Sequence, residues 1–416
     1  MVDTLTRRKF LLASGVTGAA ALAAGAATVG WREIAGRAEA DPLPTDATIL
    51  VLVTLYGGND GLGTLVPYAD GAYHDARPDL AYGENEVLKL DDKLGLNPAM
   101  KGFKALWDAK RLAIVRGVGY PKPDHSHFRS MDIWQTGSPD HPTTTGWIGR
   151  WLDATRPDPL RVVSVGATVP PLAVGTKAAG VALPLSSFEP PAGPLGAGVR
   201  RLAAADPADP PAQASAARAT STLLSATAAF GPPLDAATGS ADEDNDDDEK
   251  TRGASAGGQG GLARQLSVVA RCVRAGVPTQ VYAVSLGGFD THADEKGTQS
   301  RLLGELDGAV AGFLADLDED PRGSKVVVAI YSEFGRRVAA NASQGTDHGT
   351  AGPLLVAGHP VRGGFYGDQP SLTALDAGDL KVTTDFRSVY GTLLERVLDT
   401  EADRVLDGTR PTLGFL

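Results

Sequence analysis

One stretch of the sequence, residues 325–358, constrains the fold more than any other. It begins with the apolar run VVVAI, which is typical of a strand buried on both faces of a sheet. Glu333 follows this run, Asp347 and His348 come after a loop of small and polar residues, and a second apolar run covers residues 353–357. Ligands of open α/β sheets bind outside the carboxyl ends of the strands. The stretch therefore predicts a carboxylate and a histidine at that edge of a sheet.

Apolar runs that alternate with helical patterns extend this prediction to the rest of the chain. Further buried strands are predicted at residues 47–56, 111–119, 160–166 and 279–286, and helices at residues 97–108, 128–135, 145–152, 262–275, 298–317 and 385–398. Asn97 and Thr384 are the expected N-caps of the first and last of these helices. The alternation predicts an α/β fold with a central, mostly parallel sheet flanked by helices on both faces.

The first 40 residues have the pattern of an export signal. Arg7 and Arg8 begin the twin-arginine (Tat) signature RRKFLL, an uncharged Ala/Gly-rich run covers residues 13–30, and the AEA motif at residues 38–40 has the form of a signal-peptidase site. We therefore expect recognition by the Tat export machinery, a mature chain from about Asp41, no stable membrane insertion after cleavage, and a periplasmic or secreted location. A retained membrane anchor is the alternative.

The remaining residues, 41–416, are expected to form one α/β domain with an insertion. Residues 184–261 are rich in Pro, Ala and Gly and include an acidic run, which predicts a disordered surface insertion with one Ala-rich helix at residues 213–229. The net charge of −11 argues against a nucleic-acid partner. The single cysteine excludes an intrachain disulfide.

Four polar clusters each follow a predicted strand, and they hold four of the seven histidines of the chain. The clusters are Asp60; Asp124 with His125, Ser126 and His127; Asp290 with His292; and Glu333 with Asp347 and His348. Imidazole and carboxylate groups bind Zn²⁺, Mn²⁺ or Fe, and oxygen-rich positions also accept Mg²⁺ or Ca²⁺. The clusters therefore predict a site for one or two divalent metal ions.

Each candidate ligand also has a structural alternative. Asp60 lies in a GGNDG turn, whose chemistry favours an aspartate in any case. Asp290 could cap the helix that follows it, and Glu333 could pair with a following arginine. Asp347 could orient a histidine instead of binding the metal itself.

Ser126 stands where a helix is predicted to begin. Helix N-termini present amide donors to anions, so a serine nucleophile there suits phosphoryl or sulfuryl transfer. A capping role is the alternative, and His125 or His127 would then serve as additional metal ligands. Arg336 is a further candidate for contact with the substrate.

Taken together, these motifs resemble a known family. In chain order they are RRKFL at residues 7–11, GGNDGL at 57–62, HSHF at 125–128, FDTH at 289–292, SEFGR at 332–336, GTDHG at 345–349 and TTDFR at 383–387. The combination resembles the secreted domain-of-unknown-function family 1501, which in turn looks like a branch of the alkaline phosphatase and sulfatase superfamily.

The resemblance implies an alkaline phosphatase-like fold and a secreted, metal-dependent hydrolase of phosphate or sulfate esters with a small-molecule or polymer substrate. It implies that Ser126 is the nucleophile. The implied metal ligands are Asp60, Asp290, His292, Glu333 and His348. Glutamate at position 333 and Phe334 in place of a second histidine depart from the superfamily pattern, which leaves one ion or two open. A catalytically inactive member of the same fold, acting as an extracytoplasmic binding or assembly protein, is the alternative function.

Overall fold

The computed structural model describes residues 27–28, 31–185, 261–408 and 410–416. The Ala-rich helix predicted at residues 213–229 and the acidic run lie outside these residues. The strands of the main sheet are β1 (Ala27–Thr28), β2 (Ile49–Leu55), β6 (Leu112–Gly119), β7 (Val162–Val165), β8 (Val181–Leu183), β9 (Val281–Leu286), β10 (Val326–Ser332), β11 (Gly352–Gly358), β12 (Gly364–Tyr366) and β13 (Thr384–Asp385). A small antiparallel sheet contains β3 (Leu65–Val66), β4 (Leu88–Lys89) and β5 (Gly95–Leu96).

The main sheet is parallel except for one strand. Its order is β1-β8-β7-β9-β2-β10-β11-β6-β12, and β13 also pairs with β6. Only β11, among the strands described, runs against its neighbours, β10 and β6. The prediction of a mostly parallel sheet is therefore confirmed.

Both faces of the central strands are buried, because successive side chains of a strand point to opposite sides. In β2, Ile49, Val51 and Val53 pack into one hydrophobic cluster, whereas Leu50 and Leu52 pack into another. The same alternation continues along β10 and β6. An uninterrupted apolar run in the sequence is the result, since each side of the strand faces a core.

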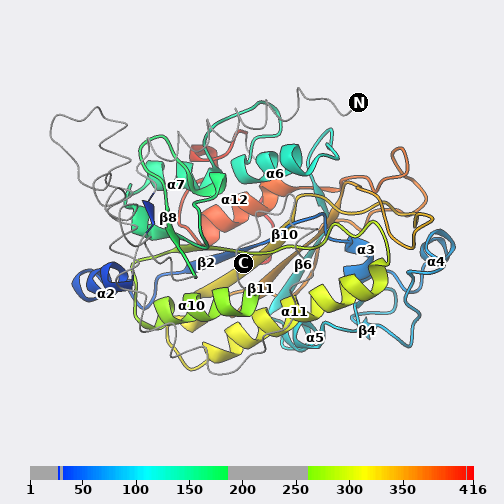
Figure 1. Ribbon diagram of the computed structural model, residues 1–416, viewed down its shortest axis with the longest axis horizontal. Coiled ribbons are helices and arrows are strands. Elements are labelled where there is room, and N and C mark those ends of the chain that lie inside the picture. The colour runs from blue at the N-terminus through cyan, green and yellow to red at the C-terminus, as the bar shows by residue number, and fades with distance from the viewer. Residues whose placement is uncertain (1–26, 29–30, 186–260, 409) are drawn as a thin grey trace, which may run out of the picture.

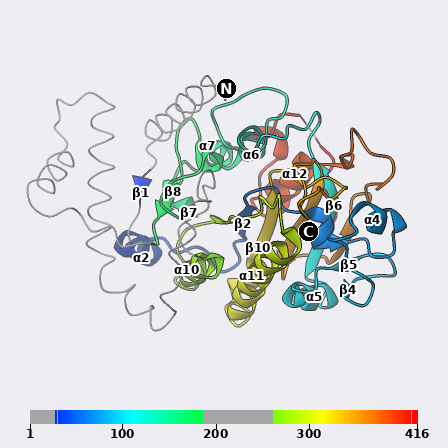
Figure 2. The same ribbon diagram turned by 45° about the vertical axis from the view of Figure 1, so that its right-hand side comes forward.

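Helices cover both faces of the sheet, as predicted (Figure 1). They are α2 (Trp31–Ala40), α3 (Gly61–Thr64), α4 (Gly71–Ala76), α5 (Lys101–Asp108), α6 (His127–Thr136), α7 (Trp147–Ala154), α10 (Leu262–Arg274), α11 (Glu295–Asp316) and α12 (Phe386–Arg396), with 3₁₀ turns at Pro159–Arg161, Pro171–Ala173, Gly323–Lys325 and Ala402–Arg404. Helices α6, α7 and α12 lie on one face, and α5, α10 and α11 lie on the other (Figures 1 and 2). None of the helices in the described ranges has the length and apolar character that crossing a membrane would need.

Two helix N-caps differ from the prediction. Asn97 does not cap α5 itself, whose N-cap is Met100: its Oδ1 atom accepts the N–H of Ala99 at 3.0 Å in the turn before the helix, and its amide donates to the carbonyl oxygen of Gly63 at 2.8 Å. Asp385, and not Thr384, caps α12 by accepting the backbone N–H of Arg387 at 2.9 Å. Thr384 is held in β13 by pairing with β6.

One edge of the sheet collects the carboxyl ends of β2, β6, β9 and β10, because these strands run parallel. β10 pairs with β2 along its whole length, and β2 pairs in the same way with β9. The antiparallel β11 begins at this same edge, so the loop between β10 and β11 leaves the sheet and returns to it there. The predicted polar clusters are thus delivered to one side of the molecule.

Helix α2 packs against the domain, although the sequence assigns it to the export signal. Ile34 is 0% exposed and Ala38 is 8% exposed, and both belong to the hydrophobic cluster on one face of the sheet. Arg37 Nη2 lies 2.6 Å from Asp158 Oδ2. The AEA motif therefore stands at the end of a packed helix, and cleavage after it remains a prediction.

If α2 belongs to the folded domain, Ile34→Ala should lower the free energy of unfolding by about 2–4 kcal/mol, because it removes a buried side chain and leaves a cavity. Urea denaturation of the full chain measures this. Glu39→Ala, on the exposed side of the same helix, is the control and should change stability by less than about 0.5 kcal/mol. If both substitutions change the free energy of unfolding by a negligible amount, α2 is only the end of the export signal and not part of the folded domain.

Candidate metal centre

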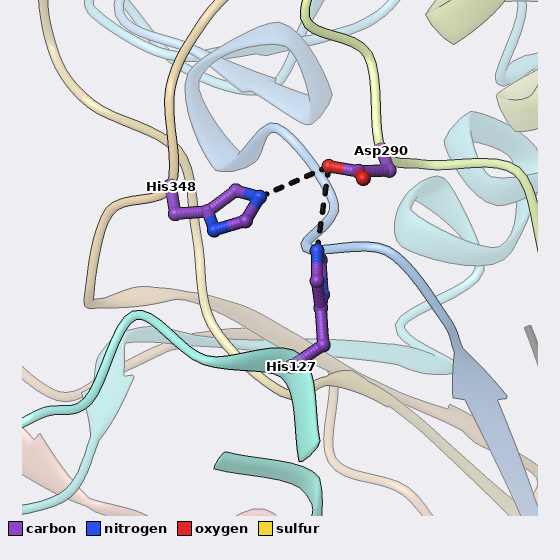
Figure 3. Close-up of side chains that lie close together, drawn as sticks. All are labelled: His127, Asp290 and His348. Carbon is purple, nitrogen blue, oxygen red and sulfur yellow. Dashed lines mark hydrogen bonds and ion pairs between the residues drawn. The ribbon is translucent and has the colours of Figure 1, made fainter. Parts of the chain in front are cut away.

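Three side chains from three strand-end segments meet at this edge (Figure 3). They are His127 at the start of α6, Asp290 after β9, and His348 in the loop between β10 and β11, and one ligand atom of each lies within 4.8 Å of the others. Asp290 Oδ1 is 3.4 Å from His127 Nε2 and 3.1 Å from His348 Nε2. His292 lies beside them, with its Nε2 atom 3.0 Å from Asp290 Oδ1 and 3.0 Å from His348 Nε2.

His127 and His348 are each oriented by a hydrogen bond that the Nδ1 atom of the ring makes. His127 Nδ1 lies 2.8 Å from Glu333 Oε1, and His348 Nδ1 lies 2.8 Å from the carbonyl oxygen of His125. Because a carboxylate and a carbonyl only accept hydrogen bonds, each Nδ1 donates and each Nε2 faces Asp290. Histidine ligands of metal ions usually have this outer hydrogen bond.

The cluster fits a divalent transition metal. Two imidazoles and one carboxylate are a ligand set that Zn²⁺, Mn²⁺ and Fe²⁺ accept. His127 Nε2 is inaccessible to solvent, and its contact with Asp290 Oδ1 at 3.4 Å is an ion pair without good hydrogen-bond geometry. A buried polar atom without a good hydrogen bond is costly, and a metal ion at this position would remove that cost.

The charges within the cluster shift two pKa values strongly. Burial opposes protonation of His127, but the carboxylates of Asp290 and Glu333 outweigh it and raise the His127 pKa to about 9. Burial also acts against ionised Asp290, yet His127, His348 and Arg336 hold the Asp290 pKa well below its usual range. A metal ion bound at His127 Nε2 would displace the proton that this raised pKa keeps on the ring.

Arg336, which we predicted to contact the substrate, is instead buried beneath the cluster. Its Nη2 atom donates to Asp290 Oδ1 at 2.6 Å and to the carbonyl oxygen of Phe289 at 2.9 Å. The same guanidinium donates to the carbonyl oxygens of Gly57, Gly58 and Thr346. A side chain with these partners is part of the protein interior and is not exposed to a substrate.

Glu333 is placed behind His127 rather than inside the cluster. Its Oε1 atom accepts the backbone N–H of Gly57 at 2.9 Å as well as the His127 ring, and its Oε2 atom accepts the Ser332 hydroxyl at 2.9 Å. The neighbouring Phe334 ring packs against the rings of His127 and His348, at centroid distances of 4.9 and 5.0 Å. Glu333 therefore orients a histidine, and the phenylalanine occupies the position where the superfamily pattern has a second histidine.

Asp60, the first carboxylate predicted as a ligand, forms a buried ion pair instead. Arg77 Nη1 lies 2.6 Å from Asp60 Oδ2, and Arg77 Nη2 lies 2.9 Å from Asp60 Oδ1. Asp60 also caps α3 through the N–H of Leu62. Both carboxylate oxygens are thus engaged away from the cluster.

Glu295, at the start of α11, lies next to this ion pair. Its Oε2 atom accepts the hydroxyl of Thr346 at 2.6 Å, in the loop that carries His348. Burial and the negative charge of Asp60 raise the pKa of Glu295 to about 8. The carboxyl group is therefore mostly protonated at neutral pH.

The other predicted residues lie around the cluster. Ser126 is exposed at the N-cap of α6, and its side chain does not cap the helix. His125 Nε2 lies 2.8 Å from Asp379 Oδ2, so its ring points to a different carboxylate. Asp347 is exposed and lies 3.5 Å from His292 Nδ1, a position suited to orienting that histidine.

Sequence reasoning missed Arg77 and Glu295. Arg77 lies 17 positions after Asp60 and has no local pattern that links the two residues. Glu295 resembles any acidic residue in the first turn of a helix. Only the tertiary structure brings them to the ion pair.

The fold and this cluster define an α/β protein with a histidine–carboxylate site at the carboxyl edge of a parallel sheet. The family described as "Protein of unknown function (DUF1501)" matches residues 47–395, and the chain belongs to this family. The family predicted from the sequence motifs is therefore confirmed. No curated protein matches the chain significantly.

Several solved structures are similar to the chain at low identity. A protein of the alkaline phosphatase superfamily from Vibrio parahaemolyticus is 10% identical with a TM-score of 0.38, covering 88% of this chain and 69% of that one. The lipoteichoic acid synthase LtaP from Listeria monocytogenes is 9% identical with a TM-score of 0.37, covering 95% and 79%. The phosphonate monoester hydrolase SpPMH from Silicibacter pomeroyi is 11% identical with a TM-score of 0.33, covering 85% and 73%. These identities and TM-scores are too low to assign an activity to this chain.

Asp60→Asn should lower the free energy of unfolding by about 3–5 kcal/mol, because it leaves the Arg77 guanidinium buried without its counter-charge. It should leave the number of metal ions bound per chain unchanged. Chemical denaturation and elemental analysis of the folded variant measure the two effects. Loss of metal at unchanged stability would restore Asp60 to the ligand set.

The Glu295 pKa predicts a pH-dependent stability. The folded protein keeps a proton on this carboxyl that the unfolded chain releases, so stability should fall as the pH rises from about 4.5 to about 8. Glu295→Gln, which cannot ionise, should remove this part of the pH dependence, as measured by thermal unfolding across that range. The exposed Glu319→Gln is the control, and an identical pH profile in both variants would contradict the assignment.

Proposed function

We propose that this protein is an exported, metal-dependent hydrolase of phosphate or sulfate esters whose centre holds one divalent ion. His127, Asp290 and His348 would bind the ion, and His292 is placed to complete the set. One ion is the better fit because Asp60 and Glu333 are engaged by other partners. These contacts therefore favour one ion over the two that the sequence also allows.

The observation that carries the proposal is the convergence of nitrogen and oxygen ligand atoms whose outer hydrogen bonds are already made. Surface histidines and aspartates often lie near one another by chance. They do not usually have each Nδ1 fixed by an acceptor while each Nε2 faces one shared oxygen, as His127 and His348 do around Asp290. This arrangement favours a metal centre over a group of surface charges.

The start of α6 supports an anionic ester as the substrate. The first N–H groups of a helix have no partner within the helix, and the helix dipole favours a negative group there. Ser126, at this N-cap, has its hydroxyl free of any capping bond and exposed next to the ligand His127. We assign Ser126 as the nucleophile: its oxygen would bond to the phosphorus or sulfur atom as the alcohol of the ester leaves, with the positive end of the helix dipole beside the anionic group.

The metal would act as a Lewis acid on the ester oxygens. The chain's own residues would keep the ligand atoms in place: Glu333 fixes the His127 ring, and the carbonyl oxygen of His125 fixes the His348 ring. The cluster is open to solvent, since the Asp290 side chain is 49% exposed and the His292 side chain is 46% exposed. Such a site admits a small ester or a segment of a polymer.

The Tat-like N-terminus supports export to the periplasm or beyond as part of the same proposal. The alternative function, a non-catalytic binding or assembly protein of the same fold, predicts a metal that only stabilises the domain. The two functions differ in whether ester hydrolysis depends on the metal and on Ser126.

His348→Ala should lower the affinity for metal by at least about 10-fold and abolish hydrolysis of 4-nitrophenyl phosphate or 4-nitrophenyl sulfate, because it removes one of the few ligands. Metal content and turnover of the purified protein are the measurements. His359→Ala is the matched control, since His359 pairs with Asp318 away from the cluster and its loss should change neither value.

Ser126→Ala separates the two functions. The hydrolase predicts a loss of turnover of at least about 100-fold with the metal retained, because the nucleophile is gone. Metal binding in the wild-type chain without any metal-dependent turnover would favour the non-catalytic alternative. Absence of bound metal in the folded wild-type protein would exclude both the metal-dependent hydrolase and the metal-stabilised binding protein.

A further inference from the structure

We propose that Arg336 is a positioning residue of the metal centre, which fixes the Asp290 carboxylate in the orientation that binds the ion. This inference rests on the centre proposed above. Arg336 touches neither the substrate nor the metal in this role, and it acts through Asp290.

The contacts of Arg336 join three segments that are distant in the sequence. Its donors reach the carbonyl oxygens of Gly57 and Gly58 after β2, of Phe289 after β9, and of Thr346 before β11. These are the segments on which the sheet edge delivers its polar residues. One buried guanidinium thus sets the spacing between the segments that carry Asp290 and His348.

The contact with Asp290 is made to the oxygen that the histidines face. Arg336 Nη2 lies 2.6 Å from Asp290 Oδ1, the atom that is also nearest to His348 Nε2 and His292 Nε2. The Asp290 side chain is half exposed, and its other contacts are with His127, His292 and His348, which would themselves bind the ion. Arg336 is therefore the partner that would keep the carboxylate from rotating into solvent. The planar guanidinium removes that freedom, because the same group is anchored to the four carbonyl oxygens.

Charge and geometry act in opposite directions at this site. The positive charge of Arg336 repels a divalent ion, whereas its fork of donors holds the ligand that binds the ion. Lysine keeps the charge but lacks the planar fork, and one ammonium group cannot reach all of these acceptors. Arg336→Lys therefore isolates the geometric role from the electrostatic one.

A second buried arginine provides a matched control. Arg77 is as buried as Arg336 and also makes an ion pair with a strand-end aspartate, Asp60, together with bonds to the carbonyl oxygens of Val338 and Arg337. It has no contact with Asp290 among the described bonds. Arg77→Lys should therefore disturb the fold to a similar degree without disturbing the carboxylate of the centre.

The test is a Zn²⁺ titration of the folded full chain against a chromophoric chelator, with unfolding measured in parallel. Arg336→Lys should weaken Zn²⁺ binding by about 10–100-fold, the range typical of residues that orient metal ligands, whereas Arg77→Lys should lose stability but keep its Zn²⁺ affinity within about 3-fold. Equal losses of affinity in both variants, or none in Arg336→Lys, would overturn the positioning role and leave the proposed centre intact.

Two further outcomes are decisive. If Arg336→Lys does not fold, Arg336→Gln replaces it; it removes the charge as well, and an affinity equal to or higher than that of the wild type would show that repulsion, not positioning, is the main effect of Arg336. A wild-type chain that binds no Zn²⁺ would overturn both the centre and this inference.

Discussion

Parallel pairing of β2, β9 and β10 is the constraint on which the site depends. Parallel strands all end at the same edge, so every segment that leaves a carboxyl end starts from one place. The antiparallel β11 adds to this effect, since its first residue, Gly352, also lies at that edge. Asp290 and His348 are brought together because one follows β9 and the other precedes β11, although they are 58 positions apart.

At that edge, partners within the protein decide which polar groups are available to a ligand. Arg77 binds both oxygens of Asp60, and His127 with Gly57 binds Glu333. Asp290 is half exposed, and its Oδ1 atom accepts a hydrogen bond from Arg336 while it also faces His348. A carboxylate that follows a strand is a candidate metal ligand because of its position. The neighbouring cation or imidazole then determines whether it binds the metal or only holds another side chain in place.

The fold could be predicted from the sequence because burial on both faces leaves an uninterrupted apolar run. The run at residues 47–56 became β2, and the one at 326–330 became most of β10. Helix starts were less predictable, since Asn97 caps a turn that precedes α5 and the helix itself begins only at Lys101. Residues 31–40 show a deeper limit, because the small residues of the AEA motif suit a cleavage site and a packed helix equally well.

The site was predictable in its location but not in its members. Asp290, His292 and His348 follow or precede strands, which the pattern of runs reveals. The sequence HSHF does not show which of its side chains turns toward the cluster, whereas in the structure Ser126 is the N-cap of α6 and His127 is its first helical residue. The separate roles of Asp60 and Glu333 depend on Arg77 and His127, which only tertiary packing brings to them.

Anomalous X-ray diffraction from crystals of the metal-loaded protein tests the central claim most directly. The account predicts one peak per chain, about 2.0–2.2 Å from His127 Nε2, His348 Nε2 and an oxygen of Asp290, with Asp60 still bonded to Arg77. A peak bound by Asp60 or Glu333, or a second peak beside the first, would contradict it.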